Sequence, residues 1–497
     1  MYNACYFQSE EMALKVYNTL TDKKEEMRAG RRSFFGLFGK KKIKMFVCGP
    51  TVYDFIHIGN ARTFVIFDFI TKFLEYQGYD VYYIQNITDI DDRIINKAKE
   101  ENVKPKEIAE KFEKQYLHDV EVMKIDAVDD YPRATEHIDE IISQVKTLVK
   151  KGYAYTARSV ITDSPDAIND LTNKDVYFDV SKSEDYGKLS KQKLTEQESG
   201  TRVKVEDNKD DPRDFILWKA QNYTYEPAWK SPWGMGRPGW HIEDTAISEK
   251  YLGSQYDIHC GGLDLKFPHH EAEIAQQEAA SGKKPFVKYW LHSGMLTNKG
   301  EKMSKSLGNF VTVGEALKTH PVEVWRFFML SAHYRSPIDY TDNNIKQAKA
   351  TLSRLIEFKT RLESVQTKDS NPEVVEKFAK MKEEFISDMT DDFNTPKAFA
   401  VLFNFIRETN ILIDENKVGK VNANDILKFL EDINMFLKII PEEEETPKEI
   451  KDLVEKREKA RENKEFEKSD SLREEIEEKG YTVKDTTIAP GYTLQKK

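Results

Sequence analysis

The order of apolar and polar positions predicts that strands and helices alternate through the first part of this chain. A short apolar run at 45–47 ends at a Gly49–Pro50 break, and after a loop a helical pattern begins near Asn60 and stops at Gly78. A second strand-like run follows at 80–88. Two strands joined by one helix form a βαβ unit, and its strands are parallel. The pattern therefore predicts an α/β fold whose ligands lie beyond the carboxyl ends of its strands.

The later segments differ in character and indicate several domains. Residues 153–236 contain short strands, polar turns and a charged patch, which predicts a subdomain inserted between two halves of one sheet. From 346 to about 440 the helical periodicity is almost continuous, as in a helix bundle, and an acidic run at 442–445 marks a linker. The predicted divisions are 12–135 (first half of the α/β domain), 136–237 (inserted subdomain), 238–290 (second half), 291–345 (connector), 346–440 (helical bundle) and 441–497 (small C-terminal domain).

Composition narrows the class of protein. The net charge of −10 argues against indiscriminate nucleic-acid binding, although a local basic face can still bind phosphates. Three cysteines are too few for a disulfide framework and favour a reducing cytoplasm. No apolar run approaches the roughly 20 residues of a membrane span. We expect residues 1–11 to be a leader or an alternative start, and the basic stretch 31–42 to be a surface insertion rather than a membrane or RNA patch.

Two separate stretches carry residues suited to phosphate chemistry. His57, Gly59 and Asn60 form a turn at the start of a helix, where backbone N–H groups and side-chain donors face anionic oxygens. Far downstream, Lys302 and Lys305 lie in a Gly-containing polar loop, TNKGEKMSKSLGN, that suits a mobile clamp. Positioned cations of this kind stabilise the charge that develops on a transferring phosphate.

A third set of residues suggests a metal. His269 and Glu273 are four apart near a predicted helix start and therefore share one face. Together with Cys48 they would suit zinc, which prefers Cys, His and carboxylate ligands. The alternative is a buried cysteine acting as a small hydrophobe beside a surface His–Glu pair. We expect His259 and His270 to be structural or close to the nucleotide.

The paired HIGN and KMSKS motifs resemble those of class I aminoacyl-tRNA synthetases, and the chain from about Leu14 onward resembles the cysteinyl-tRNA synthetase family. The matching stretches are MFVCGPTVYDFIHIGNAR, QNITDIDDRII, SPWGMGRPGWHIE, GGLDLKFPHHEAEIAQ, GEKMSKSLGN and DDFNTPKAFAVLFNF. The resemblance implies a doubly wound, Rossmann-type (HUP-like) catalytic domain split by an insertion, followed by a KMSKS-bearing connector, a DALR-like helical bundle and an anticodon-recognition domain. It also implies a monomeric cytoplasmic ligase that uses ATP with Mg²⁺ to join cysteine to tRNA(Cys), without a membrane or a covalent enzyme intermediate.

Site residues follow from the same resemblance, position by position. It implies catalytic roles for His57, Asn60, Lys302 and Lys305, with Lys305 stabilising the transition-state phosphate. The residues implied to bind ATP are His57, Gly59, Asn60, Asp264, Lys302, Ser304 and Lys305. Those implied to surround cysteine are Cys48, Thr88, Trp240 and His269.

The family's zinc, one per subunit, binds the substrate sulfur and so distinguishes cysteine from serine, because a soft thiolate bonds zinc better than a hydroxyl does. Cys48, His269 and Glu273 match three of its ligands, but the fourth position, a cysteine in the family, is Asp244 here. Three alternatives stand: Asp244 completes an altered site, Cys260 compensates, or zinc is weak or absent. The tail DTTIAPGYTLQKK also departs from the family, so anticodon contacts there do not carry over.

Two rival functions remain at this stage. A related ligase would give activated cysteine to a small-molecule amine, but such ligases lack long C-terminal domains, whereas this chain has residues 346–497 beyond its connector. A tRNA-binding paralogue without activity would be consistent with Asp244, but the intact HIGN and KMSKS motifs argue against it.

Overall fold

The computed structural model describes residues 13–28, 41–158, 166–168, 170, 172–192, 209–303, 308–368, 370–442, 447–485 and 492–496. The predicted phosphate-binding residues Ser304 and Lys305, the segment 1–11 and most of the basic stretch 31–42 lie outside these residues. The chain forms two compact units, one comprising 1–352, 380–402 and 435–437, the other 353–379, 403–434 and 438–497.

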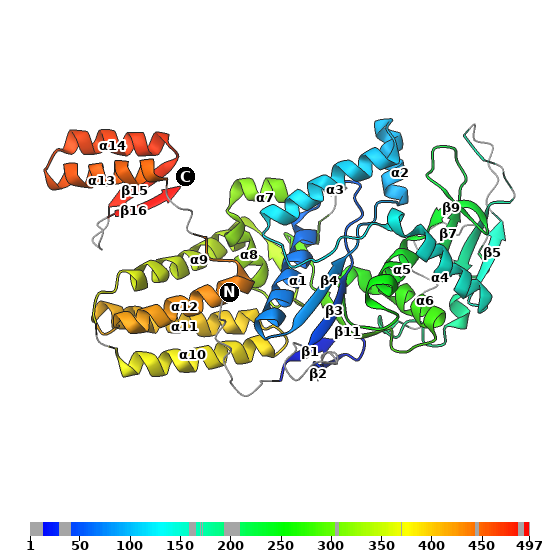
Figure 1. Ribbon diagram of the computed structural model, residues 1–497, viewed down its shortest axis with the longest axis horizontal. Helices are drawn as coiled ribbons and strands as arrows, with labels where there is room; N and C mark the ends of the chain where they lie inside the picture. Colours follow the sequence, from blue (N-terminus) through cyan, green and yellow to red (C-terminus); the bar gives the residue numbers. More distant parts are fainter. Residues whose placement is uncertain are drawn as a thin grey trace. The chain divides into compact units, whose positions relative to one another are not determined.

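A four-stranded parallel sheet lies at the centre of the first unit (Figure 1), in the order β11-β10-β3-β4. Its strands are β3 (Lys42–Val47), β4 (Asp80–Gln85), β10 (Tyr256–Gly262) and β11 (Val287–Ser293). Helix α1 (Ile58–Tyr76) joins β3 to β4, so the predicted βαβ unit is confirmed. The strand order reverses between β3 and β10, and open α/β sheets bind ligands at the carboxyl ends of strands at such a switch point.

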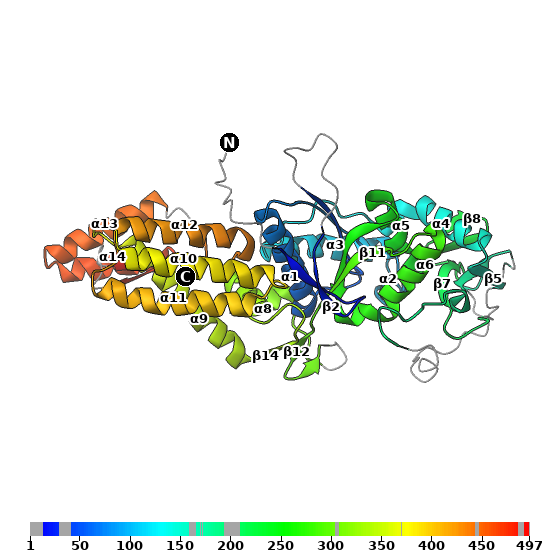
Figure 2. The ribbon, with the colours of Figure 1, turned by 90° about the horizontal axis from the view of Figure 1, so that it is seen from below.

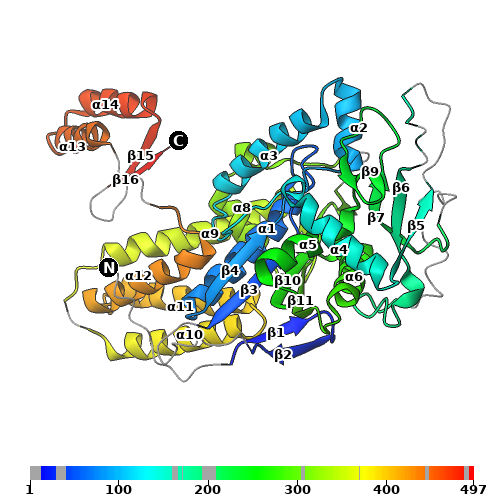
Figure 3. The ribbon, with the colours of Figure 1, turned by 45° about the vertical axis from the view of Figure 1, so that its right-hand side comes forward.

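Helices cover both faces of this sheet (Figure 3). On one face, α5 (Trp240–Leu252) and α6 (Glu271–Ser281) bury an apolar core. Its buried members are Phe46, Cys48, Ile84, Leu189, Ile247, Leu252, Tyr256, Ile274, Phe286, Val287 and Trp290. On the other face Thr71 of α1 donates a hydrogen bond to the Met45 sulfur at 3.5 Å. The predicted α/β doubly wound architecture is therefore present.

The inserted segment forms a five-stranded antiparallel sheet in the order β5-β6-β7-β9-β8. Its strands are β5 (Ala154–Arg158), β6 (Lys174–Phe178), β7 (Phe215–Ala220), β8 (Trp229–Ser231) and β9 (Gly234–Pro238). Apolar side chains of this sheet pack on α4 (Ile138–Lys150), α5 and α6. Because β9 ends at Pro238 and α5 begins at Trp240, the insertion returns the chain directly to the sheet's carboxyl edge.

Smaller elements complete the first unit. The hairpin strands are β1 (Lys15–Asn18) and β2 (Lys23–Glu26), and the helices that follow β4 are α2 (Asp92–Glu101) and α3 (Pro105–Val122). The connector contains β12 (Leu296–Asn298), β13 (Glu301–Lys302), α7 (Val313–Thr319), α8 (Val322–Leu330) and β14 (Ile338–Tyr340). Its strands form a three-stranded sheet in the order β13-β12-β14, so the first lysine of the KMSKS motif lies at the end of an edge strand.

Four long helices follow, and α10, α11 and α12 run side by side (Figures 1 and 2). They are α9 (Asp342–Glu363), α10 (Pro372–Thr390), α11 (Thr395–Asp414) and α12 (Lys420–Leu437). Within the second unit the Phe378 ring contacts those of Phe405 and Phe429, with centroids 5.9 and 5.8 Å apart.

The C-terminal elements belong to the second unit. They are α13 (Lys448–Glu462), α14 (Phe466–Glu478) and the antiparallel pair β15 (Tyr481–Asp485) and β16 (Tyr492–Lys496). A small core of Ile450, Leu453, Val454, Ile476 and Val483 holds them together. Among the helices that the structure describes, none is both long and apolar enough to cross a membrane.

Candidate active site

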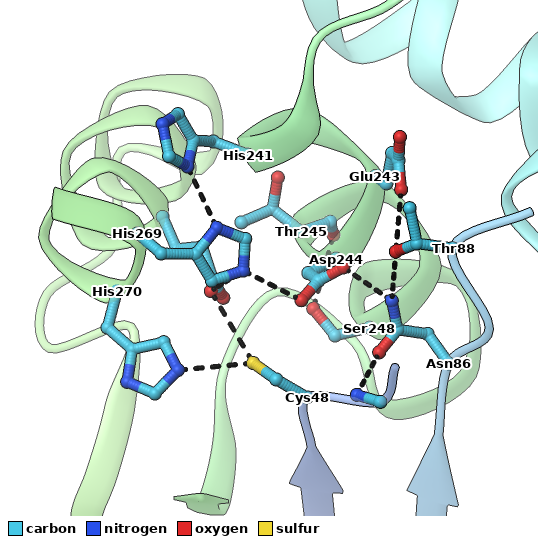
Figure 4. A network of polar contacts seen from close by, with 12 residues as sticks. Cys48, Asn86, Thr88, His241, Glu243, Asp244, Thr245, Ser248, His269 and His270 are labelled. Carbon is cyan, nitrogen blue, oxygen red and sulfur yellow. Dashed lines mark hydrogen bonds and ion pairs between the residues drawn. The ribbon is translucent and has the colours of Figure 1, made fainter. Parts of the chain in front are cut away.

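Cys48, the residue that follows β3, lies at the centre of a buried polar cluster (Figure 4). Its sulfur is 3.1 Å from His270 Nε2, 3.3 Å from His259 Nε2 and 3.8 Å from Glu273 Oε1. Strand β10 pairs with β3 so that His259 is opposite Phe46, one residue before the end of β3, and this register brings His259 to the thiol. The sequence predicts a structural role or a position close to the nucleotide for the two histidines, and the structure places both against Cys48.

The predicted metal ligands come together in this cluster. His269 Nε2 lies 3.1 Å from Asp244 Oδ2 and 3.1 Å from Glu273 Oε1. All three residues are buried, and their ligand atoms and the Cys48 sulfur lie within 4.8 Å of one another. Asp244 therefore reaches the group despite replacing a cysteine of the family.

Cys260 does not belong to this cluster. Residues of a strand alternate between its two faces, and Cys260 follows His259 and pairs with Val47. Neither of the two groups of potential metal ligands found among the described residues contains Cys260. The alternative in which Cys260 compensates for the missing family cysteine is therefore wrong.

Asn86 and Glu243 extend the cluster beyond the predicted residues (Figure 4). Asn86 Nδ2 donates to Asp244 Oδ1 at 2.7 Å, and Asn86 Oδ1 accepts from the Gly49 amide at 2.8 Å. Thr88 donates its hydroxyl hydrogen to Glu243 Oε2 at 3.1 Å. Asn86 follows β4 directly, a position where ligand-binding residues are common in α/β folds, and this signal was present in the sequence.

Trp240 forms the outer wall of the cluster. Its ring stacks on that of His269 with centroids 4.2 Å apart, and the residue remains 37% exposed. His269 Nδ1 lies 2.8 Å from His241 Nδ1, so both nitrogens of His269 have partners. Contacts at both nitrogens fix the orientation of the ring, and the rings of metal-binding histidines are usually fixed by a partner at the second nitrogen.

A pocket of about 220 Å³ opens beside Trp240 and Glu243. It lies between the segment that follows β4 and the inserted sheet, and Asp92, Lys219 and Arg237 line it. The Asp92 carboxylate pairs with both cations, which leaves the pocket with a mixture of charges rather than one sign.

The phosphate-binding residues predicted from the HIGN motif meet at the start of α1. Asn60 N donates to His57 Nδ1 at 3.0 Å, and His57 N donates to Asn60 Oδ1 at 3.4 Å, which closes a capping box. A Cβ at Gly59 would lie 2.7 Å from His57 Nδ1, so a larger residue here would displace the His57 ring from its capping position. Lys302 Nζ lies 3.1 Å from Asp264 Oδ2, which brings together two further predicted ATP ligands.

Burial governs the ionisation of the Cys48 cluster. It raises the pKa of the Cys48 thiol well above its usual value, and the charges of Glu273 and Asp244 raise it further. Burial likewise raises the pKa of Glu273, and it lowers the pKa of His259 and of His270. A bound divalent cation would reverse this balance, because it favours the thiolate and the carboxylate as ligands. A buried oxygen, Glu273 Oε2, has no hydrogen-bond partner among the described residues, so the cluster fits a metal ion.

Comparison with known proteins first defines the class. The model of the tRNA synthetases class I (C) catalytic domain matches residues 34–350, that of the DALR domain 384–440, and that of the cysteinyl-tRNA ligase anticodon binding domain 443–487. Methionyl-tRNA synthetase from Mycobacterium tuberculosis, solved with methionyl-adenylate, has the same fold with a TM-score of 0.58, 16% identity, and coverage of 80% of this chain and 90% of that chain. A ternary complex of Agrobacterium radiobacter K84 LeuRS, agnB2, with tRNA and LeuAMS gives a TM-score of 0.58 at 11% identity, covering 81% and 84% of the two chains. The fold and the matched catalytic domain are those of a class I aminoacyl-tRNA synthetase.

Curated relatives then identify the family. Cysteine–tRNA ligase from Clostridioides difficile (strain 630) is 45% identical over 95% of this chain and 98% of its own length. The enzyme of the same name from Thermodesulfovibrio yellowstonii is 44% identical, with the same two coverages. This chain belongs to the cysteine–tRNA ligase family.

Proposed function

We propose that the chain activates cysteine with ATP and transfers the cysteinyl group to the 3′ end of tRNA(Cys). The observation that carries the proposal is the 45% identity to a cysteine–tRNA ligase along 95% of the chain. The convergence of Cys48, His269 and Glu273 beside Trp240 supports it, because a metal ion held by these residues would bind a thiol in preference to a hydroxyl.

The ATP phosphates bind between the start of α1 and the KMSKS loop. The capping box of His57 and Asn60 fixes the first turn of α1, whose N-terminus favours negative charge. Lys302 pairs with Asp264 in the structure, and its ammonium group turns toward the phosphates when ATP binds. Ser304 and Lys305 are predicted to contact the same phosphates. The substrate carboxylate attacks the α-phosphorus, pyrophosphate leaves, and Mg²⁺ accompanies the nucleotide.

The cysteine side chain enters beside Thr88 and Trp240 and points toward the buried cluster. Cys48, Asp244, His269 and Glu273 would hold zinc, and bound zinc would supply a bond to the substrate sulfur that a serine hydroxyl matches poorly. Asn86 holds the Asp244 carboxylate and His241 holds the His269 ring, which orients the protein's ligands before substrate arrives.

Arg62 connects the two halves of the ATP site. Its buried guanidinium, on α1 just after the HIGN turn, donates to the carbonyl oxygens of Gly294, Met295 and Ser336 at 2.5, 3.0 and 2.7 Å. These residues flank β12 and β14, which belong to the sheet that carries Lys302. The lysine clamp is thereby held at a defined distance from the start of α1.

The remaining assignments extend this proposal. The enzyme works as a monomer in the cytoplasm, and residues 441–497 read the anticodon of the tRNA. The match of residues 443–487 to the model of the cysteinyl-tRNA ligase anticodon binding domain favours tRNA over a small-molecule amine as the acceptor.

The decisive experiment is amino-acid-dependent ATP–pyrophosphate exchange with cysteine or serine, with and without a strong chelator, followed by aminoacylation of tRNA(Cys). We expect exchange with cysteine alone, its loss after prolonged chelation, and transfer to tRNA. Lys302→Ala is expected to lower the exchange rate about 100-fold, whereas the matched variant of an exposed helix lysine, Lys318→Ala, retains the wild-type rate. If neither cysteine nor serine supports ATP–pyrophosphate exchange, the proposed enzymatic activity is refuted. Exchange with cysteine but no transfer to tRNA would favour another acceptor.

A further inference from the structure

The buried cluster contains two overlapping groups of four metal ligands. Cys48 and Glu273 belong to both. Asp244 and His269 complete the first group, which we call the aspartate position, and His259 and His270 complete the second, which we call the histidine position. Because the two positions share a thiolate and a carboxylate, one ion fills only one of them at a time.

The histidine position has the spacing of a tetrahedral site. In a tetrahedron, zinc bonds of 2.0–2.3 Å place neighbouring ligand atoms about 3.3–3.8 Å apart. The Cys48 sulfur lies 3.3 Å from His259 Nε2 and 3.1 Å from His270 Nε2. His259 Nε2 lies 3.5 Å from Glu273 Oε2. Small adjustments of these side chains would therefore admit an ion.

The two oxygens of Glu273 face different positions. Oε1 lies 3.1 Å from His269 Nε2, in the aspartate position. Oε2 faces His259 and is buried without a hydrogen-bond partner among the described residues. Buried carboxylate oxygens almost always have a partner, so this unpaired atom points to a ligand at the histidine position.

Both histidines are held with Nε2 turned toward the thiol. His259 Nδ1 lies 2.6 Å from the Tyr256 hydroxyl, and His270 Nδ1 lies 2.9 Å from His292 Nε2. His292 Nδ1 in turn lies 2.9 Å from the Thr19 hydroxyl. If each Nδ1 carries the proton of these hydrogen bonds, the Nε2 lone pairs of His259 and His270 are free to bind a metal.

We propose that Cys48, His259, His270 and Glu273 form a second metal position. This position holds the ion when the substrate cysteine is absent. Its donors are one thiolate, two imidazoles and one carboxylate, whereas the aspartate position offers one imidazole and two carboxylates with the thiolate. Zinc and cobalt(II) prefer nitrogen and sulfur donors to carboxylates in such sites. A cysteine at position 244 would give the first position a second thiolate, so Asp244 shifts the balance toward the histidines. The inference concerns the site of the proposed function and takes its metal chemistry from it.

The test titrates Co²⁺ into the full-length, metal-free protein in competition with a chelating dye, without cysteine. Asp244→Asn removes a ligand of the aspartate position but keeps an amide for Asn86, and His259→Gln removes a ligand of the histidine position. His320→Gln, outside the cluster, is the control. We expect Asp244→Asn to change the Co²⁺ affinity less than threefold and His259→Gln to lower it at least tenfold. The reverse order of effects, or no stoichiometric Co²⁺ binding by the wild type, would overturn the proposal.

X-ray absorption of the zinc-loaded wild type provides a second readout that does not depend on any variant. One sulfur and two imidazoles around the ion are expected, and one sulfur with a single imidazole would overturn the proposal. This measurement also decides the question if His259→Gln fails to fold by circular dichroism. Neither readout uses catalysis, so loss of cysteine-dependent exchange in the wild type would refute the proposed function without affecting this test.

Discussion

Replacing Arg62 by methionine should separate the two halves of the ATP site while leaving the cysteine pocket intact. The guanidinium is buried and donates to carbonyl oxygens that flank two strands of the connector, and its partners include no carboxylate among the described residues. Methionine fills a similar length of space but provides no donor. The buried carbonyl groups would then lose their partner.

The magnitude follows from the two opposing effects of this side chain. Its three hydrogen bonds of 3.0 Å or less, each from a charged donor, contribute about 1.5–3 kcal/mol apiece. Burial lowers the pKa of Arg62 to about 10, which corresponds to about 3 kcal/mol against the charged form. We therefore expect Arg62→Met to destabilise this region by about 2–6 kcal/mol. A displacement of the lysine clamp by about 1 Å would lower the rate of adenylate formation about 100-fold.

Two assays measure these effects. Hydrogen–deuterium exchange should show faster exchange at 293–296 and 333–338, and pyrophosphate exchange should show a lower kcat with a KM for cysteine within about twofold of the wild type. Arg62→Lys, which keeps the charge but cannot contact all the carbonyls, should be intermediate. Arg407→Met, at an exposed arginine of α11, controls for the loss of a charge. Wild-type kcat and wild-type protection in Arg62→Met would refute the reasoning.

Three further results are expected. Asp68→Asn should destabilise the first unit by about 3–5 kcal/mol, because it leaves the buried Arg326, 2.9 Å away, without its carboxylate. A free energy of unfolding, measured by thermal denaturation, that changes by less than about 1 kcal/mol would contradict this. Asp244→Cys should tighten zinc binding at least about tenfold, since it adds a second thiolate, and competition with a chelating dye would measure the change. In the second unit, burial raises the pKa of Asp485, but the positive charges of Arg457 and neighbouring arginines outweigh this effect, and the net result is a lowered pKa. The resulting stabilisation is complete above the ordinary aspartate pKa of about 3.9 and is lost as the pH falls through the lowered value, so proteolysis of 447–496 should accelerate there in the wild type and show less pH dependence in Asp485→Asn.

Local patterns were enough to predict the parts of the site that lie within one element. The helix predicted near the HIGN motif begins within it, at Ile58, and its capping box joins His57 to Asn60. His269 and Glu273, four residues apart, contact each other at 3.1 Å. These features depend on helix geometry and backbone hydrogen bonds among near neighbours, so a short stretch of sequence determines them.

What the sequence by itself determined is therefore the class of fold, the family and the separate pieces of the site. The tertiary structure decided which pieces meet. His259 reaches Cys48 only because β10 pairs with β3 in one register, and Asp244 reaches His269 only because α5 and α6 pack on the same face of the sheet. Cys260, one residue from His259, is excluded by the alternation of side chains along the same strand. Register and helix packing depend on many apolar contacts between distant segments, and a one-residue shift would exchange the residues that face the buried polar cluster.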